Sequence, residues 1–474
     1  DRVFLQEKKM PAIVRQTMSR TLARDLLTDI QNSDNEYYIG IGKCDTFNQS
    51  DSVIDPVDCL REEREFRNNL QSIKKVEAST IVARRVNWSS GSAYAGWDDS
   101  VKSDIDENWT PFYVLNDAKE VYVCLSPADV VSTVEPNWGL HAPMSPETDP
   151  NAPMYNVREW WKPFTTSDGY IWKFLYTLTP ERIFQFLSSN HIPVQQAETD
   201  LPSGDSIEDL QITVRDNAVP GQIIRSRLVT SGTGYSQSSP PTINIFGDGD
   251  GAIAVAVIDE NGNLVKVNMT DYGSGYTHAS FEIVGGSSPS VVEPVITSSK
   301  GLGYNPVDDL KTSSIMINTK PDGTVDDTFI VNNTFRQIGL IKNPTQTDGI
   351  TPYINVSDKI LPSMTLEGTS TFTKGKLITG ATSGAKAYVD DSIGNEVYYH
   401  QNLSTGFEPF KTGENGNPGE GVFDESTTET GVIITTTLQN VVDRSSGDLL
   451  YIENRARIRR HEEQKEDIKI VITV

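Results

Sequence analysis

The stretch Asp467-Ile-Lys-Ile-Val-Ile-Thr-Val474 decides how the chain is organised. Every second position in it is apolar, at Ile468, Ile470, Ile472 and Val474. This period of two is typical of a β-strand with one buried face. A strand at the end of a chain leaves its backbone donors and acceptors unpaired unless an earlier strand receives them. We therefore expect the chain to return, at its end, to a sheet that is built far upstream.

The length and composition predict several β-rich domains. A chain of 474 residues is too long for one ordinary hydrophobic core, and length alone suggests roughly three units of about 150 residues each. The chain has 35 glycines and 25 prolines, together with many short alternating runs and few long helical ones. This pattern favours a mainly β, multi-domain protein of sandwich-like or barrel-like modules with a few peripheral helices.

The charge limits the classes of partner. The formal net charge is −24, and a nucleic-acid-binding face gains affinity by neutralising phosphates with lysine and arginine. The same charge disfavours an anionic membrane surface. The sequence has no run of about 20 apolar residues, the length that a membrane helix needs. We expect a soluble protein with neither a nucleic acid nor a membrane as partner.

No motif supports a metal, a cofactor or catalysis. Cys44, Cys59 and Cys124 match neither a disulfide framework nor a metal-binding pair, so we expect buried free thiols in a reducing cytosol. The five histidines lack metal-site spacing, and Asp248-Gly-Asp-Gly251 matches only half of a calcium loop, which favours a turn. The sequence has no nucleophile elbow and no phosphate-binding loop. We predict that the protein is not an enzyme and binds no metal or cofactor.

Two amphipathic helices and a strand are predicted near the start. Apolar residues four apart predict a helix over residues 12–30, and a strand follows at 37–41. A second helix is predicted to begin near Asp58 as its N-cap. Its predicted apolar side carries Phe66, Leu70 and Ile73.

An aromatic strand follows the turn Asp168-Gly169. Tyr170, Trp172 and Phe174 alternate along it and share one face. So large an aromatic face needs a cover, because rings of this size bury much apolar surface. We select these three residues as candidates for a structural or interaction role.

Between residues 219 and 308 a short motif recurs. It appears as Ser231-Gly-Thr-Gly-Tyr235, Tyr272-Gly-Ser-Gly-Tyr276 and Lys300-Gly-Leu-Gly-Tyr304. Each motif is a turn signal, in which the glycines accept positive φ and the tyrosine folds back as a plug. Tyr235, Tyr276 and Tyr304 are therefore candidates for a structural or interaction role in this β-module. A second module, from residue 351, has the pattern of a small β-barrel.

Arg455, Arg457 and Arg459 lie on one side of a predicted strand near the C-terminus. They alternate with Ile452, Asn454, Ala456 and Ile458 on the other side. Such a charged face pairs with an acidic neighbour or with the protein's own carboxylates. Because the whole chain is acidic, we favour a protein contact over nucleic acid for these arginines.

Several stretches, in order, resemble one family of phage proteins. They are Tyr38-Ile-Gly-Ile-Gly42 after the first helix, Asp168-Gly-Tyr-Ile-Trp-Lys-Phe-Leu-Tyr176, Phe335-Arg-Gln-Ile-Gly-Leu-Ile-Lys-Asn-Pro344 and Gly447-Asp-Leu-Leu-Tyr-Ile-Glu-Asn-Arg455. The family is the gene product eight baseplate wedge proteins of T-even-like contractile-tailed phages. The resemblance covers roughly residues 10–205, 305–345 and 445–474, and none of its stretches is a catalytic motif. It implies a mainly β subunit that forms a homodimer and binds other baseplate wedge proteins.

Two modules depart from that family, so we expect a discontinuous core. Its parts are residues 1–205, 305–350 and 445–474, with inserted β-modules at 206–304 and 351–444. The predicted function is that of a virion structural protein of the tail baseplate, which is assembled in the host cytoplasm and rearranges when the contractile tail contracts. A tail-associated protein that binds a carbohydrate receptor through the inserted modules is the alternative. A polysaccharide hydrolase is a third hypothesis, for which acidic pairs such as Asp390-Asp391 supply no specific residue.

Overall fold

The protein is mainly β and has several domains. The structure, a computed structural model, describes residues 15–47, 51–101, 109–145, 151, 157–197, 206–321, 329–368, 372–414, 417–424, 430–438, 441–461, 464 and 466–474. The chain divides into two compact units, one of residues 1–24, 80–316 and 472–474, and the other of residues 25–79 and 317–471. The unit boundaries fall inside α1 (Gln16–Gln31), β3 (Ala78–Arg84), β15 (Ser314–Thr319) and β25 (Ile468–Thr473). The domain division predicted from the sequence stays a prediction.

The last strand pairs with a strand built far upstream, as its alternation predicts. β25 lies beside β15 in a four-stranded sheet of order β25-β15-β3-β8, in which β8 is His191–Pro193. The Ser313 hydroxyl donates to the Val474 carbonyl over 3.1 Å, and the Ser314 and Thr473 hydroxyls are 2.8 Å apart. Ile468 and Ile470 are buried. Pairing with β15 therefore satisfies the backbone groups on one side of this terminal strand.

The first unit contains an aromatic core on a four-stranded sheet of order β4-β5-β7-β6. The Asp168-Gly169 turn forms as predicted, since the Asp168 carboxylate accepts hydrogen bonds from the backbone of Thr133 and Val134, and Gly169 has a φ of 90°. The sheet comprises β4 (Tyr113–Leu115), β5 (Glu120–Ser126), β6 (Phe164–Thr165) and β7 (Ile171–Thr177). Among the described residues, the helices of this part of the unit are α3 (Trp138–His141), α5 (Pro180–Phe186), α6 (Ser206–Asp216) and α7 (Pro306–Asp309).

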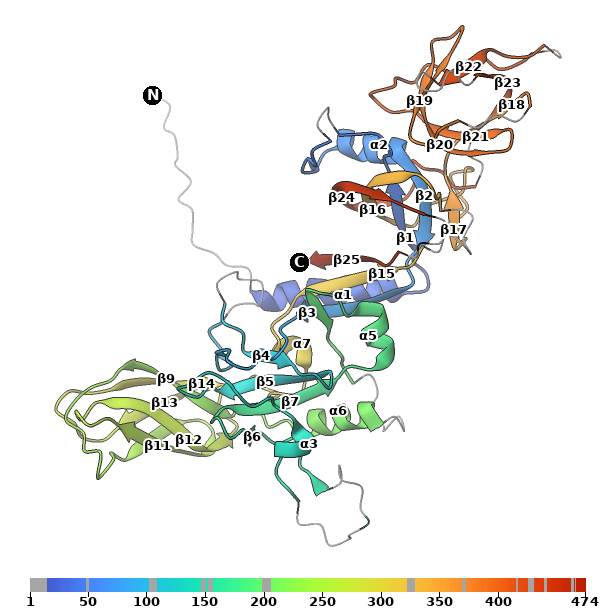
Figure 1. Ribbon diagram of the computed structural model, residues 1–474. Coiled ribbons are helices and arrows are strands. Elements are labelled where there is room, and N and C mark those ends of the chain that lie inside the picture. The colour runs from blue at the N-terminus through green and yellow to red at the C-terminus, as the bar shows by residue number, and fades with distance from the viewer. Residues whose placement is uncertain are drawn as a thin grey trace, which may run out of the picture. The chain divides into compact units, whose positions relative to one another are not determined.

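The Gly-x-Gly-Tyr motifs lie in and beside paired ribbons of the same unit, here called the ribbon module (Figure 1). Its two-stranded sheets are β14-β9, β10-β13 and β11-β12. The strands are β9 (Ile223–Thr230), β10 (Ile243–Gly247), β11 (Asp250–Ile258), β12 (Leu264–Ser274), β13 (Ala279–Ile283) and β14 (Val291–Ile296). The predicted positive φ is confirmed at all the motif glycines, Gly232, Gly234, Gly273, Gly275, Gly301 and Gly303. Asp248-Gly-Asp-Gly251 connects β10 to β11, and Asp248 accepts hydrogen bonds from Thr277 and His278.

The second unit contains a five-stranded sheet of order β17-β2-β1-β16-β24. Its strands are β1 (Tyr37–Gly42), β2 (Leu70–Lys75), β16 (Thr334–Lys342), β17 (Ser357–Lys359) and β24 (Asp448–Arg459). All pairs in it are antiparallel. Tyr38, Phe66, Ile73 and Ile341 belong to its buried core.

The second predicted helix is shorter than its apolar pattern suggests. α2 spans Leu60–Asn69, its N-cap is Cys59 rather than Asp58, and Leu70 already has an extended backbone. The prediction that Leu70 and Ile73 continue the helix is therefore wrong. Both residues belong to β2, which forms backbone hydrogen bonds with β1 and β17. This pairing with distant segments outweighs the helical spacing of the apolar residues.

Residues 363–437 contain a closed six-stranded barrel, which confirms the barrel-like pattern (Figure 1). The strands follow the order β18-β21-β20-β19-β22-β23 and close back on β18. They are β18 (Ser363–Leu366), β19 (Leu377–Gly380), β20 (Lys386–Ile393), β21 (Glu396–His400), β22 (Gly421–Asp424) and β23 (Thr430–Thr437). Closure leaves the barrel with no strand edge.

The three cysteines are free, but they do not share one environment. Cys44 and Cys124 are buried, as expected, whereas Cys59 is exposed. The expectation of a buried thiol is therefore wrong for Cys59. It is the N-cap of α2 and lies within a stretch, residues 52–61, in which every residue is exposed.

Candidate functional site

β24 forms one edge of the five-stranded sheet. It pairs with β16 on one side, and no strand in the described part of the chain pairs with its other side. An unpaired strand side presents backbone donors and acceptors to a partner. The 12-residue length of β24 therefore makes this edge a prominent candidate for a contact.

The register of β24 is interrupted where the predicted arginine face begins. Phe335 lies opposite Ile458 and Gln337 opposite Asn454, so four steps along β24 face two along β16. As a result Arg455, Ala456 and Arg457 are all exposed, and the strict alternation predicted from the sequence is wrong here. Bulges and charged side chains keep an edge from pairing with a foreign strand. A contact at this edge would therefore use side chains more than backbone.

A groove of about 570 Å³ lies between β24 and the chain that leads into α2. We call it the α2–β24 groove, and residues 56–60, Glu63 and residues 449–452 line it. Val57, Leu60 and Leu450 are 63%, 67% and 48% exposed. The Asn454 side chain donates to the Ile54 carbonyl over 3.0 Å and holds the two walls together. Large apolar side chains clustered in one groove are typical of a surface that another molecule covers.

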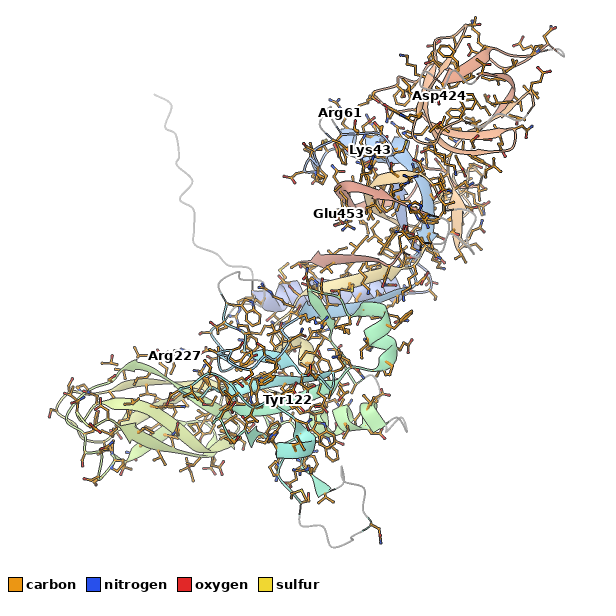
Figure 2. All side chains as sticks on the ribbon, in the orientation of Figure 1. Lys43, Arg61, Tyr122, Arg227, Asp424 and Glu453 are labelled. Carbon is orange, nitrogen blue, oxygen red and sulfur yellow. The ribbon has the colours of Figure 1, made fainter. Side chains whose placement is uncertain are left out.

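Charges of both signs border this groove. Asp58 and Glu63 line its α2 wall, and the arginines follow on β24 beyond it. Arg455 pairs with Glu453 at 3.1 Å. Among the residues that the structure describes, Arg457 and Arg459 have no ion-pair partner. Arg61 and Glu453 mark the α2 and β24 sides in Figure 2.

An ion pair between the buried Arg336 and the half-buried Asp51 anchors the chain that leads to the groove. The Arg336 guanidinium donates to both carboxylate oxygens of Asp51, over 2.8 and 3.0 Å, and to the Cys44 carbonyl over 2.6 Å. These hydrogen bonds hold the pKa of Asp51 below its usual value, against a smaller effect of burial. The groove wall is thus tied to β16, which carries Arg336 and pairs with β24.

The aromatic candidates on β7 lie in the core of the first unit. Tyr170, Trp172 and Phe174 are buried, and the rings of Tyr170 and Trp172 stack at 5.7 Å. The Tyr170 hydroxyl donates to the Val130 carbonyl over 2.9 Å. These rings build the scaffold and present no surface to a partner.

The three motif tyrosines differ in their burial. Tyr235 and Tyr276 are buried plugs, and the Tyr235 hydroxyl accepts a hydrogen bond from the Ser290 backbone over 3.1 Å. Tyr304 is 40% exposed, with the Lys300 ammonium 4.4 Å from the centre of its ring. The motif tyrosines belong to the first unit, and the arginine candidates belong to the second.

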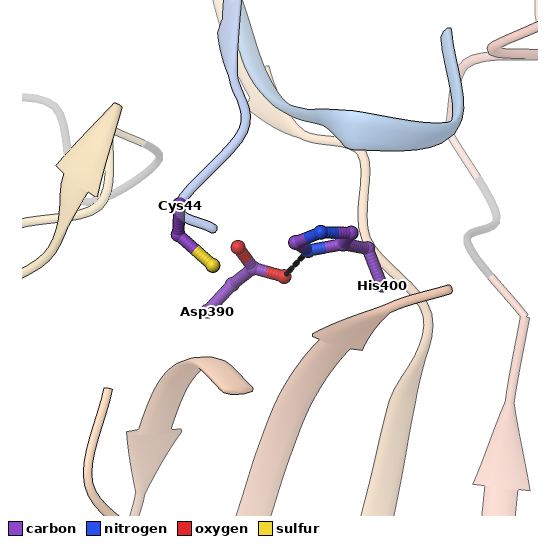
Figure 3. A group of neighbouring side chains, drawn as sticks. All are labelled: Cys44, Asp390 and His400. Carbon is purple, nitrogen blue, oxygen red and sulfur yellow. Dashed lines mark hydrogen bonds and ion pairs between the residues drawn. The ribbon is translucent and has the colours of Figure 1, made fainter. Parts of the chain in front are cut away.

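A buried polar cluster joins Cys44, Asp390 and His400 (Figure 3). Ligand atoms of the three residues lie within 4.8 Å of one another. The Asp390 carboxylate lies between the thiol and the imidazole, and His400 Nδ1 is 2.6 Å from one of its oxygens. The Gln71 amide donates to the other oxygen over 2.6 Å. The cluster thereby connects β2 with the barrel strands β20 and β21.

This cluster fits a structural role better than a catalytic or metal-binding one. A nucleophilic cysteine needs a histidine beside it, whereas here the acid separates the two. Burial, then the charge of Asp390, raises the pKa of the Cys44 thiol well above its usual value, so the thiolate that zinc prefers is disfavoured. Both oxygens of Asp390 already have hydrogen-bond partners.

The sequence did not reveal the groove or the cluster. Cys44 and His400 are far apart in the chain, and no local spacing predicts their contact. The apolar residues Val57 and Leu60, beside the predicted start of the second helix, are the only hint of the groove in the sequence.

None of the described helices is long and apolar enough to span a membrane. A comparison with protein-family models and another with curated proteins find no match for this chain.

Proposed function

We propose that this protein is a structural subunit of a phage tail baseplate wedge, without enzymatic activity, and that it forms a homodimer through the α2–β24 groove. In this proposal it also binds other wedge proteins, resides in the virion and is assembled in the host cytoplasm. The groove supports the homodimer, because it joins exposed apolar residues to charges of both signs on one surface. The ordered stretches that resemble baseplate wedge proteins support the assembly role. Two of the family-like stretches, in β16 and β24, pair with each other beside it.

A second copy of the chain is the occupant that the charges favour. A two-fold interface places the same patch of both subunits face to face, so the patch must complement itself. Here the α2 wall carries Asp58 and also Glu63, which pairs with Arg67 at 2.9 Å, whereas Arg457 and Arg459 lie along β24 without ion-pair partners in the described part of the chain. A two-fold axis through the groove would bring the acidic wall of one copy to the arginines of the other. The apolar residues Val57, Leu60 and Leu450 would fill the centre.

The oligomeric state tests this interface directly. Light scattering coupled to size-exclusion chromatography should give a dimer for the full chain at micromolar concentration. Leu60→Asp should weaken the dimer at least about tenfold, since it places a charge in the desolvated centre. Ile354→Asp is the matched control, because Ile354 is 64% exposed just before β17, at the opposite edge of the sheet. A monomeric wild type, or equal effects of the two variants, would rule out this interface.

Charge reversal separates the electrostatic part. Arg457→Glu with Arg459→Glu should weaken the dimer, and added salt should then strengthen the association instead of weakening it, because the attraction becomes a repulsion. Adding Asp58→Arg, on the α2 wall of the groove, should restore part of the affinity. If the arginine variants left the dimer unchanged but abolished binding to another tail protein, the arginines would belong to a heteromeric contact instead.

The place in the particle needs a separate experiment. Cross-linking mass spectrometry of intact contractile tails should recover cross-links from this chain to baseplate proteins. Absence of the chain from purified baseplates would overturn the assembly role, whatever its oligomeric state in solution.

A further inference from the structure

Two adjoining recesses lie in the first unit, where the β6–β7 edge of the core sheet meets the ribbon module. Their volumes are about 580 and 270 Å³. Thr165, Ile171, Met269 and Tyr272 line both. We call the pair the β7–β12 recess, after the two strands that form its walls.

The ribbon module is fixed against the core beside this recess. Arg225 and Arg227 of β9 reach the Asp98 carboxylate over 2.8 and 2.7 Å. Arg225 also lines the smaller part of the recess. On β12, the Lys266 ammonium donates a hydrogen bond to the Pro127 carbonyl over 3.3 Å. These ties make the recess a preformed site, which lowers the ordering cost of binding a ligand.

The recess combines aromatic rings with free polar groups. Trp161 and Tyr272 are half-buried in its lining. Within the described residues, the Gln222 side-chain amide, the Trp161 indole nitrogen and the Tyr272 hydroxyl have no hydrogen-bond partner. The Asn217 amide nitrogen donates to the Thr213 carbonyl, which leaves its oxygen as an acceptor. Aromatic faces pack against the C–H faces of sugar rings, while amides and hydroxyls bond to sugar hydroxyls.

The charge in the recess is opposite to that of the whole protein. Lys162, Lys173, Lys266 and Arg225 line it, together with the carboxylate of Asp271. Lys162 pairs with Glu159 at 2.9 Å and Arg225 with Asp98 at 2.8 Å, so Lys173 and Lys266 supply the local positive charge. Lys173 and Lys266 donate to backbone carbonyls, of Trp161 and Pro127, which neutralise no charge. On a chain with a net charge of −24, a local excess of cations favours an anionic ligand.

We propose that the β7–β12 recess binds an acidic oligosaccharide, whose sugar rings pack on Trp161 and Tyr272 and whose carboxylate or phosphate groups face the lysines. Gln222 and Asn217 bond to its hydroxyls. This site is independent of the proposed homodimer interface, which lies in the other unit, so the failure of either proposal leaves the other standing.

Titration calorimetry on the full chain tests this site with three probes. They are tetragalacturonate, a phosphorylated mannose oligosaccharide and neutral maltotetraose. At least one acidic probe should bind with a Kd of about 1 mM or tighter, which is about −4 kcal/mol. The neutral probe should bind at least tenfold more weakly. Binding of the carboxylate probe alone or the phosphate probe alone would identify the anionic group, and binding of neither would overturn the proposal.

Variants locate the site. Tyr272→Ala and Gln222→Ala should each reduce the affinity for the acidic probe at least fivefold, whereas Tyr272→Phe should retain the stacking and most of the affinity. Lys162→Gln should weaken the binding of the acidic probe and leave the binding of the neutral probe unchanged. Phe246→Ala, at an exposed aromatic on β10 outside the recess, should bind like wild type. Unfolding temperatures verify that each variant is folded, and full affinity in folded Tyr272→Ala and Gln222→Ala would overturn the proposal.

Discussion

The barrel and the ribbon module show two ways of stabilising a small β structure. The barrel closes on itself and encloses a core in which twelve of the described residues are buried and apolar, among them Phe372, Ile378 and Val389. The ribbon module consists of separate two-stranded sheets around a core of six, among them Tyr235 and Leu264. Several of its large apolar residues, including Phe246, Ile253 and Val255, stay exposed. An isolated hairpin is only marginally stable in water, so the ribbons need support from elsewhere.

That support comes from turns and from attachment to the core. The Tyr276 ring lies against Gly247, Gly249 and Gly273, where a Cβ atom would come within 2.9 Å or less of it. Asp98 ties β9 to the core through two arginines. The barrel should therefore be sensitive to loss of apolar volume, whereas the ribbon module should be sensitive at its glycines and its ion pairs.

The largest effect is expected in the barrel core. Phe372→Ala should destabilise the barrel by about 3–5 kcal/mol, the usual cost of a large cavity, because Phe372 is 2% exposed. Phe246→Ala in the ribbon module should stay within about 0.5 kcal/mol of wild type. Hydrogen exchange of barrel peptides measures the change. All seven tryptophans lie between residues 88 and 172, so the urea transition followed by tryptophan fluorescence should not move. Equal costs for the two phenylalanines would contradict the contrast between the modules.

A turn glycine should give the next largest effect. Gly273 has a φ of 59°, and a Cβ there would lie 2.5 Å from both the Ala252 nitrogen and the Asp250 carbonyl oxygen. Gly273→Ala should cost about 2–3 kcal/mol through backbone strain and this collision. Gly285 is the matched control, with a φ of 99° and open space around it. Gly285→Ala should cost about 1 kcal/mol from the backbone alone. Limited proteolysis of the ribbon module distinguishes the two, and similar protection in both variants would show that the tyrosine plug is unimportant.

Local sequence patterns predicted features of both modules but not the contacts between distant segments. Short alternating strands indicated the barrel, and Gly-x-Gly-Tyr indicated the turns, because both depend on neighbours in the chain. Local patterns failed at Leu70 and Ile73, whose helical spacing gave way to pairing with β1. They also failed at the β7–β12 recess, where Trp161 and Tyr272 come from different modules. Contacts between distant segments leave no periodicity, so the candidate sites required the structure, apart from the arginines on β24.

Loss of the ion pairs between β9 and the core should lower the free energy of unfolding less than the Gly273→Ala substitution does. Asp98→Asn should cost the first unit about 1–2 kcal/mol, since the ion pairs are only partly buried. Burial raises the pKa of Asp98, but hydrogen bonds from Arg227 and Ser100, with the charge of Arg225, bring it well below its usual value. Because the pKa of Asp98 is lower in the folded state than in the unfolded state, its ionised form stabilises the fold. This contribution is complete above the pKa of the unfolded state and is lost as the pH falls through the pKa of the folded state.

Thermal unfolding from pH 7 to pH 2, followed by tryptophan fluorescence, measures this dependence. The gap between wild type and Asp98→Asn should stay constant down to about pH 4, near the pKa of an unfolded aspartate, and then close. Glu260→Gln is the control, because Glu260 is exposed in the same module. A gap that closed instead between pH 7 and pH 5 would assign the effect to another group.

The smallest effect is expected on the exposed face of β11. Val255→Thr should change stability by less than about 0.5 kcal/mol, because the side chain is already in water, with an exposed fraction of 47%. Val389→Thr in the barrel, where the side chain is fully buried, should cost about 1–3 kcal/mol by burying a hydroxyl. Hydrogen exchange on both variants compares the two. A cost above about 1 kcal/mol for Val255→Thr that grew with protein concentration would mean that another copy covers the ribbon face. The ribbon module would then obtain from assembly the burial that the barrel obtains from closure.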